Sequence, residues 1–170
     1  MVHNTYHYSC VLGIDMGLSF IKTNYIENGN TMEFVRTVII NLRDSGVDVL
    51  LGGGWAEELH GIIKPRDHSD IDLYYLAEDF NKLDKFIKNS ELEEIKPKHK
   101  SHKRAFNKDG VMVEVILVQK DYKGYLSNYN QEKIIGWPAP LSTKIDGLAC
   151  LSREALAFKR SVHNYLFPRE

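Results

Sequence analysis

Two aspartates lie two residues apart in the segment Ser69-Asp70-Ile71-Asp72, which reads as the start of a strand. Side chains alternate along a strand, so Asp70 and Asp72 are expected to share one face. Two carboxylates this close repel each other unless a cation lies between them, and Mg²⁺ prefers such oxygen ligands together with substrate phosphates. The segment therefore predicts a magnesium site, and the alternative is an exposed strand edge with two solvated acids.

Glu114 is the only charged residue in the run from Val111 to Val118. A charge in the middle of an apolar strand costs free energy unless it is paired or bound to a metal. If this strand lies beside that of Asp70 and Asp72, the three carboxylates form one cluster. The alternative is a solvent-facing glutamate on an edge strand.

Three glycines, Gly52-Gly53-Gly54, stand between a predicted strand and a predicted short helix. Glycines let the backbone approach a ligand closely, and a helix N-terminus offers free N–H groups to phosphate. Taken alone, the segment favours a plain strand-to-helix turn. Together with three carboxylates it predicts two-metal nucleotidyl transfer, in which two Mg²⁺ ions hold a triphosphate and stabilise the attacking and leaving oxygens.

Hydrophobic periodicity and turn residues place these motifs on a mixed set of elements. Helices are predicted over residues 31–44, 55–60, 79–89 and 153–165, and strands over 47–51, 70–76, 104–106 and 111–118. Residues 8–27 are expected to form one or two strands, and residues 121–140, rich in Tyr, Asn, Gly and Pro, a loop. The order predicts one α+β domain in which helices pack on a sheet.

The length of 170 residues fits a single domain. We expect an N-terminal extension over residues 1–29, a core over 30–120, and a loop and C-terminal helical segment over 121–170 that completes the same domain.

Composition excludes several classes of protein. Apolar residues make up 43% and charged residues 26%, which argues against disorder, and a net charge of -1 does not favour a nucleic-acid partner. The sequence has no apolar run of roughly 18 residues that would span a membrane, and its N-terminus does not resemble a secretory signal. Cys10 and Cys150 are expected to be reduced, which predicts a cytoplasmic protein.

The segment Gly53–Gly61, followed by Arg66 and by His68–Leu73, resembles the signature of the nucleotidyltransferase superfamily. More narrowly, it resembles the small aminoglycoside and lincosamide adenylyltransferases of antibiotic resistance, in which a Gly-Gly-Trp-Ala turn leads to an Arg-x-His-x-Asp-Ile-Asp strand. The resemblance covers roughly residues 31–118. It implies a polymerase-beta-like fold, a mixed sheet with helices packed on one side.

The resemblance also implies roles for individual residues. Asp70 and Asp72 would be metal ligands, and Glu114 would be a third ligand or the general base that takes the proton from the acceptor hydroxyl. The nucleotide-binding residues would be Gly53, Gly54, Arg66, His68 and Ser69. The reaction would transfer a nucleoside monophosphate from ATP or another NTP to a hydroxyl, with Mg²⁺ as cofactor.

Three further features are each open to two interpretations. Lys159 on the last predicted helix is expected to reach a phosphate, or else to be an ordinary solvated lysine. Trp55 would stack on a base or pack in the core. The basic run Lys96–Lys103 would contact a phosphate backbone, or else form a solvated face.

The leading acceptor is a small molecule, an aminoglycoside or lincosamide antibiotic. One alternative is a protein or tRNA acceptor, as for an antitoxin-type member, which the basic run would favour. Another is an inactive homologue that only binds. Because the sequence after Lys159 is short, a second copy of the chain is expected to complete the acceptor pocket, so a homodimer is predicted.

Overall fold

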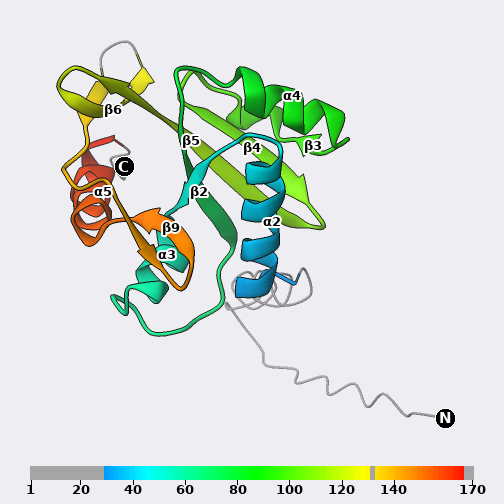
Figure 1. The fold of residues 1–170 in the computed structure, drawn as a ribbon, viewed down its shortest axis with the longest axis horizontal. Coiled ribbons are helices and arrows are strands. Elements are labelled where there is room, and N and C mark those ends of the chain that lie inside the picture. The colour runs from blue at the N-terminus through cyan, green and yellow to red at the C-terminus, as the bar shows by residue number, and fades with distance from the viewer. Residues whose placement is uncertain (1–28, 131–132, 167–170) are drawn as a thin grey trace, which may run out of the picture.

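The computed structural model describes residues 29–130 and 133–166 (Figure 1). The strands predicted within residues 8–27, and nearly all of the predicted extension, lie outside the described residues. The elements, in chain order, are α2 (Met32–Asp44), β1 (Val49–Leu51), α3 (Gly53–Leu59), β2 (Asp70–Leu76), α4 (Asn81–Asn89), β3 (Glu93–Glu94), the 3₁₀-helix η1 (Lys96–Lys98), β4 (Lys103–Lys108), β5 (Val111–Asp121), β6 (Gly124–Asn130), β7 (Lys133–Gly136), β8 (Ser142–Ile145), β9 (Leu148–Leu151) and α5 (Arg153–Leu166).

The strands form a mixed sheet with the order β3-β4-β5-β2-β1-β9-β8, and β6 pairs with both β5 and β7. At the centre, β2 runs parallel to β5 and antiparallel to β1. The strands predicted over 104–106 and 111–118 are confirmed as β4 and β5, which pair antiparallel as a hairpin. The predicted α+β domain built on a mixed sheet is therefore confirmed.

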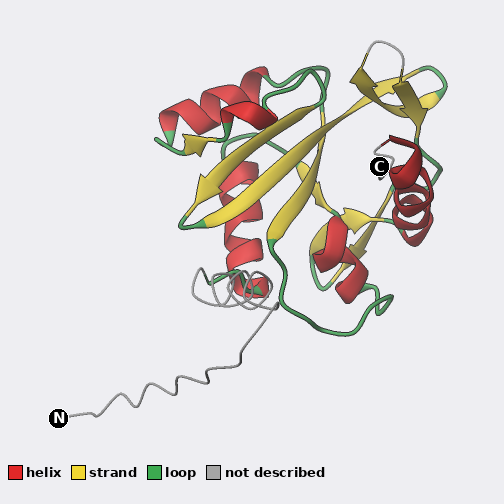
Figure 2. Ribbon diagram, turned by 180° about the vertical axis from the view of Figure 1, so that it is seen from behind, coloured by secondary structure: helices red, strands yellow, loops and turns green. Residues whose placement is uncertain are grey.

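One face of the central strands is apolar and is covered by helices. Ile71 and Leu73 on β2 pair with Val113 and Val115 on β5, and all four are fully buried. Helix α2 lies against this face, and Figure 2 shows the strands crossing in front of it. Helix α4 packs on the same face of the sheet through Phe86, whose ring centroid lies 6.4 Å from that of Phe106 on β4. The opposite face is left for the polar side chains of the same strands.

Capping side chains and a glycine set the ends of the helices. Thr31 caps α2, because its hydroxyl accepts a hydrogen bond from the Phe34 amide at 3.2 Å. Ser152 caps α5 in the same way, accepting from the Ala155 amide at 3.0 Å. Helix α2 ends at Ser45-Gly46, where the glycine takes a positive φ of 78°.

The prediction that residues 121–140 form a loop is wrong, since strands β6 and β7 lie there. Ser127 is polar at a position on β6 where an apolar residue is expected, so the sequence does not show the apolar and polar alternation of a strand. Ser127 is nevertheless fully buried. Its hydroxyl donates to the Leu117 carbonyl at 2.7 Å and accepts from the indole N–H of Trp137 at 2.9 Å. A serine satisfied in this way can replace an apolar residue on the inner face of a strand.

The hairpin of β8 and β9 was also not predicted. Its turn is Asp146-Gly147, with positive φ at both residues, 48° and 81°. Asp-Gly between two short strands is a typical signal for this turn. The pattern that identifies the hairpin was therefore present in the sequence.

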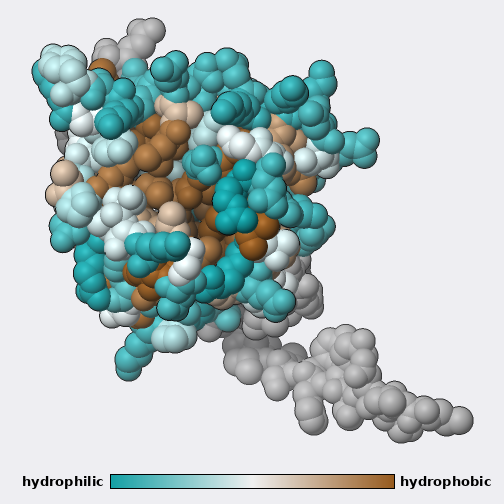
Figure 3. Space-filling model, viewed as in Figure 1, coloured by the Kyte–Doolittle hydropathy of each residue, from teal (hydrophilic) through white to brown (hydrophobic). Residues whose placement is uncertain are grey.

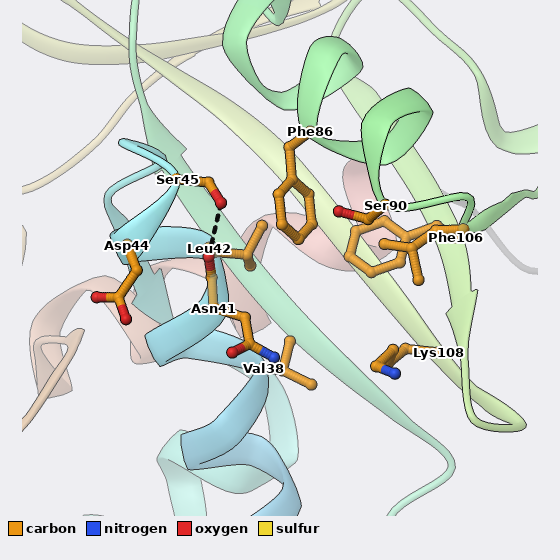
Figure 4. A pocket seen from close by; sticks show the side chains of 10 residues that line it. Val38, Asn41, Leu42, Asp44, Ser45, Phe86, Ser90, Phe106 and Lys108 are labelled. Carbon is orange, nitrogen blue, oxygen red and sulfur yellow. Dashed lines mark hydrogen bonds between the residues drawn. The ribbon is translucent and has the colours of Figure 1, made fainter.

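Two hollows lie on the side of the sheet that carries α2. One of about 410 Å³ lies between α2 and α4, where Phe86 and Phe106 face Val38 and Leu42 (Figure 4). The other, of about 460 Å³, is lined by residues of α2, β1 and β9, and apolar side chains gather in the middle of this face (Figure 3). Neither is lined by a residue of the predicted site.

No helix among the described residues is long and apolar enough to cross a membrane.

Candidate active site

The carboxylates predicted to act together lie side by side on the polar face of the sheet. The parallel register of β2 and β5 places Asp72 directly opposite Glu114, and Asp70 opposite Met112. Because side chains alternate, Asp70, Asp72 and Glu114 point to the face away from Ile71 and Val113, and so away from α2. The expectation that the strand of Glu114 neighbours that of the aspartates is confirmed.

Asp72 is the most perturbed of the three acids. Burial, the negative charge of Asp70 and the negative charge of Glu114 together raise the pKa of Asp72 to about 6. The positive charges of Lys159 and Lys103 offset only part of this effect. A carboxylate whose ionised form is destabilised by neighbouring carboxylates is electrostatically prepared to accept a cation.

The glycine turn lies directly against Asp72. Gly53 has a φ of +56°, and a Cβ on this residue would collide with Oδ2 of Asp72. A Cβ on Gly54 would likewise collide with the imidazole of His68. Both glycines are needed because the backbone at the start of α3 passes against site side chains with no room for another atom.

His68 and Ser69 support the aspartates from the loop before β2. The His68 imidazole is buried, its Nε2 lies 2.9 Å from Oε2 of Glu58, and its ring centroid is 4.2 Å from that of Trp55. Trp55 is thus part of the core, which is the second of its two predicted roles. The Ser69 hydroxyl donates to Oδ1 of Asp70 at 3.0 Å and so fixes that carboxylate.

Arg66 lies on the exposed part of the same loop, where its backbone N–H donates to Glu58 at 3.3 Å. The structure does not bring the Arg66 side chain to the aspartates. The nucleotide-binding roles of Arg66, His68 and Ser69 remain predictions.

Lys159 on α5 lies on the same side of the sheet as the acids, and it is not an ordinary solvated lysine. Burial lowers its pKa, while the charges of Asp72 and Glu114 act to raise it. An aromatic series positions the helix: the ring of Trp137 lies 5.3 Å from that of Tyr74 on β2 and 5.9 Å from that of Phe158 on α5. Lys159, the next residue, therefore holds a positive charge near Asp72.

Two lysines that contact the site acids were not predicted. Lys98 and Lys103 both bind the Glu114 carboxylate: Nζ of Lys103 lies 2.6 Å from Oε2, and Nζ of Lys98 contacts Oε1. The interpretation of Lys96–Lys103 as a solvated face is wrong for these two. Ala105 on β4 pairs with Glu114 and so lies on the face of the acids. Lys103 is two residues before Ala105, and side chains two apart on a strand share a face, so Lys103 lies on the face of the acids too.

These ion pairs determine the ionisation state of Glu114. The side chain is buried, which raises its pKa, but hydrogen bonds from Lys103 and Lys98 outweigh burial and leave the pKa below its usual value. Glu114 is ionised and its oxygens are occupied by lysines. It is neither the solvent-facing glutamate of an edge strand nor, in this arrangement, a free ligand.

The donor set fits a divalent cation at the aspartates. Asp70 and Asp72 offer carboxylate oxygens from one face of β2, and burial together with the charges of Asp70 and Glu114 raises the pKa of Asp72, so a bound cation would stabilise its ionised form. Across the described ranges 29–130 and 133–166, no three His, Cys, Asp or Glu side chains are arranged to hold a metal. The two aspartates are thus the preformed part of the predicted metal site.

A mixed sheet that presents adjacent aspartates beside a glycine turn defines a nucleotidyltransferase. The model of the aminoglycoside-2''-adenylyltransferase family matches residues 34–143, and the chain belongs to this family. The predicted resemblance and the predicted fold class are both confirmed. Among curated proteins, no sequence matches this chain significantly.

Solved structures share the fold at low sequence identity. The lincomycin-bound lincosamide antibiotic adenylyltransferase LnuA is 15% identical, with a TM-score of 0.63, over 75% of this chain and 84% of that chain. The crystal structure of ANT(2'')-Ia with adenylyl-2''-tobramycin is 15% identical, with a TM-score of 0.59, over 80% and 77%. A putative nucleotidyltransferase from Thermotoga maritima is 18% identical, with a TM-score of 0.54, over 79% and 85%.

Replacing Gly53 tests the contact between the glycine turn and Asp72. Gly53→Ala combines the strain of a positive φ, about 1–2 kcal/mol, with a collision against Asp72. Gly147→Ala is the matched control, because that glycine has a φ of +81° and open space around its Cβ position. We expect Gly53→Ala to lower the free energy of unfolding more than Gly147→Ala in urea titrations. Equal losses would contradict the close approach.

Replacing Asp72 tests the electrostatic strain of the metal-free site. The folded-state pKa of about 6 exceeds the ordinary value of 3.8, so ionisation of Asp72 destabilises the fold. This penalty is absent below pH 4, grows up to about pH 6 and is complete above it. At about 1.4 kcal/mol per pKa unit, Asp72→Asn is expected to stabilise the protein by up to about 3 kcal/mol at pH 8.

The gain should fall by about half at pH 5, measured by urea unfolding with a chelator present. Asp48→Asn, at an exposed position before β1, is the control and should change stability little at either pH. A loss of stability in Asp72→Asn at pH 8 would mean that the carboxylate is a structural anchor.

Proposed function

We propose that this protein transfers a nucleoside monophosphate from ATP or another NTP to a hydroxyl of a small molecule, in a Mg²⁺-dependent reaction that releases pyrophosphate. The observation that carries the proposal is the pair Asp70 and Asp72 on one face of β2, with the backbone of Gly53 against Asp72. Aminoglycoside and lincosamide antibiotics are the proposed acceptor class. Family membership and the tobramycin and lincomycin derivatives held by structural relatives support it.

Asp70 and Asp72 would hold the metal. Bound Mg²⁺ would neutralise the triphosphate and stabilise the charge on the attacking and leaving oxygens. Ser69 fixes one carboxylate through its hydroxyl, and the glycine backbone keeps bulk away from the other. Lys159, half-buried near Asp72, would supply a positive charge to a phosphate, and its place on α5 would let the last helix form one wall of the nucleotide site.

Glu114 was predicted to be either a metal ligand or the general base. A base works best when its pKa lies near the working pH, and the two lysines hold the pKa of Glu114 below its usual value. The lysines weaken it as a base and favour the ligand role, for which Lys98 or Lys103 must release an oxygen. In either role Glu114 acts from the strand beside Asp72.

A second candidate is an inactive homologue that binds without catalysis. One observation favours it: the Glu114 carboxylate is already satisfied by two lysines and needs no metal. The intact pair Asp70 and Asp72, whose repulsion is only partly compensated, favours the enzyme. We therefore favour the active enzyme over the inactive homologue. A protein or tRNA acceptor is the alternative to a small-molecule acceptor that the assay also tests.

We also propose that two copies of the chain associate to complete the acceptor pocket. Size-exclusion chromatography with light scattering should give the mass of a dimer at micromolar concentration. A monomer throughout this range would remove the second copy from the proposal.

The proposed reaction is tested with radiolabelled ATP, GTP, CTP and UTP, Mg²⁺ and a panel of aminoglycosides and lincosamides. We expect a labelled drug product whose rate falls by about a thousandfold or more in Asp70→Asn. Asp48→Asn is the control with an equal change of charge. Thermal stabilisation by Mg-ATP without a drug product would move the search to protein and tRNA acceptors. If there is no labelled product and Mg-ATP does not stabilise the protein, the protein is an inactive homologue.

A further inference from the structure

The start of β2, which carries the aspartates, has a strand partner on only one of its two edges. On the first edge β2 pairs with β5 over its whole length, from Asp70 to Leu76. On the second edge β1 is three residues long, and its last residue, Leu51, lies opposite Leu73. The first residues of β2 therefore extend beyond the end of β1.

A backbone amide and a side-chain amide continue the hydrogen bonding along this second edge. Gly52, which follows β1, donates its N–H to the Asp72 carbonyl at 2.9 Å. Carbonyls two residues apart along a strand point to the same edge, so the Asp70 carbonyl also faces this way. The side chain of Asn30 meets it there: its Nδ2 donates to the His68 carbonyl at 2.7 Å and lies 3.5 Å from the Asp70 carbonyl. One side chain thus takes the place of the missing length of strand.

Asn30 is itself held in place by the start of α2. The next residue, Thr31, caps the helix: its N–H donates to the Gly29 carbonyl at 2.8 Å, and its hydroxyl accepts from Phe34. In the first turn Val35 is fully buried under the sheet. The start of α2 lies beside the start of β2 (Figure 1). Asn30 therefore connects the helix of the apolar face to the strand of the acids.

The hydrogen bonds of Asn30 lie on both sides of Ser69. The two carbonyls that Asn30 contacts belong to the residues before and after Ser69, and the Ser69 hydroxyl donates to Oδ1 of Asp70 at 3.0 Å. Asn30 thus holds the backbone, and Ser69 holds the carboxylate. Because a strand side chain leaves its backbone in a fixed direction, the position of this backbone determines where the Asp70 carboxylate lies.

The free energy of this contact favours positioning over stabilisation. Within the part of the chain that the structure describes, Oδ1 of Asn30 is buried and has no hydrogen-bond partner. A buried acceptor without a partner costs free energy of the size that a donated hydrogen bond contributes. The side chain therefore adds little net stability, and its effect is the position that it imposes on the backbone of β2.

Resting on the proposed function, we propose that Asn30 is a positioning residue of the metal site. Its amide closes the open edge of β2 and so fixes the Asp70 carboxylate beside that of Asp72. Asn30 acts through the backbone and not as a ligand. Helix α2, on the opposite face of the sheet, thereby takes part in setting the geometry of the site.

The test measures binding of Mn²⁺ alone to the full chain by electron paramagnetic resonance, since Mn²⁺ takes the same carboxylate ligands as Mg²⁺. Asn30→Leu has nearly the size of the wild-type side chain and removes the donor. We expect it to weaken Mn²⁺ binding by about tenfold, as for other residues that orient a metal ligand. Asn30→Gln keeps the amide on a longer side chain and should restore part of the affinity.

Thr31→Ala is the matched control. It changes the next residue and removes the cap of α2, so it lowers the stability of the fold through a bond that lies within the helix. Its Mn²⁺ affinity should equal that of the wild type. Equal losses of affinity in Thr31→Ala and Asn30→Leu would mean that Asn30 only stabilises the start of α2, and would overturn the proposal.

Hydrogen exchange locates the effect of the substitution. In Asn30→Leu, amide exchange should become faster over residues 68–71 and stay unchanged over residues 73–75, which pair on both edges. Faster exchange throughout β2 would indicate global destabilisation and contradict the positioning role. If Asn30→Leu does not fold, Asn30→Ala repeats both measurements, because it removes the amide and adds no bulk.

The two proposals fail in different ways. If the wild type binds Mn²⁺ and transfers a nucleotide, and Asn30→Leu binds Mn²⁺ equally well, only the role of Asn30 is overturned. If the wild type binds no Mn²⁺, transfers nothing and is not stabilised by Mg-ATP, the proposed function fails, and the metal site that Asn30 would position fails with it.

Discussion

The site is organised around the repulsion between three carboxylates on one face of a parallel strand pair. Asp72 and Glu114 are opposite each other in register, and Asp70 follows two positions away on the same face. Such an arrangement is unstable without positive charge, and the described structure supplies it unevenly. Glu114 receives two lysines in direct contact, whereas Asp72 has Lys103 and Lys159 only at a distance and keeps a raised pKa. Among the described residues, Asp72 therefore has no lysine in direct contact, whereas Glu114 has two.

The two faces of the central strands solve opposite physical problems. Ile71, Leu73, Val113 and Val115 drive the packing of α2 and α4 through apolar burial, which makes the strands rigid. This rigid platform holds the acids of the other face in a strained arrangement that they would not adopt on a flexible loop. The hollows beside α2 belong to the packing side and carry none of the acids of the site.

Predictions from the sequence were most successful where the two-residue repeat of a strand determined which face a side chain takes. The alternation of Asp70 and Asp72, and the unusual charge of Glu114 in an apolar run, predicted side chains that the register then brought together. It failed where tertiary contacts decided. The pairing of Lys98 depends on how η1 turns toward β5, and strand β6 is held by the buried hydrogen bonds of Ser127. A run of lysines and a polar strand carry no local sign of such partners.

The aromatic series from Tyr74 through Trp137 to Phe158 has a mechanical consequence. It connects β2, which carries the aspartates, to α5, which carries Lys159 and Arg160, and the indole N–H of Trp137 anchors the series to Ser127. The last helix is therefore connected to the strand of the aspartates by edge-to-face aromatic contacts rather than by ion pairs. The position of its backbone relative to the acids, and hence the reach of its cations, depends on apolar packing outside the site.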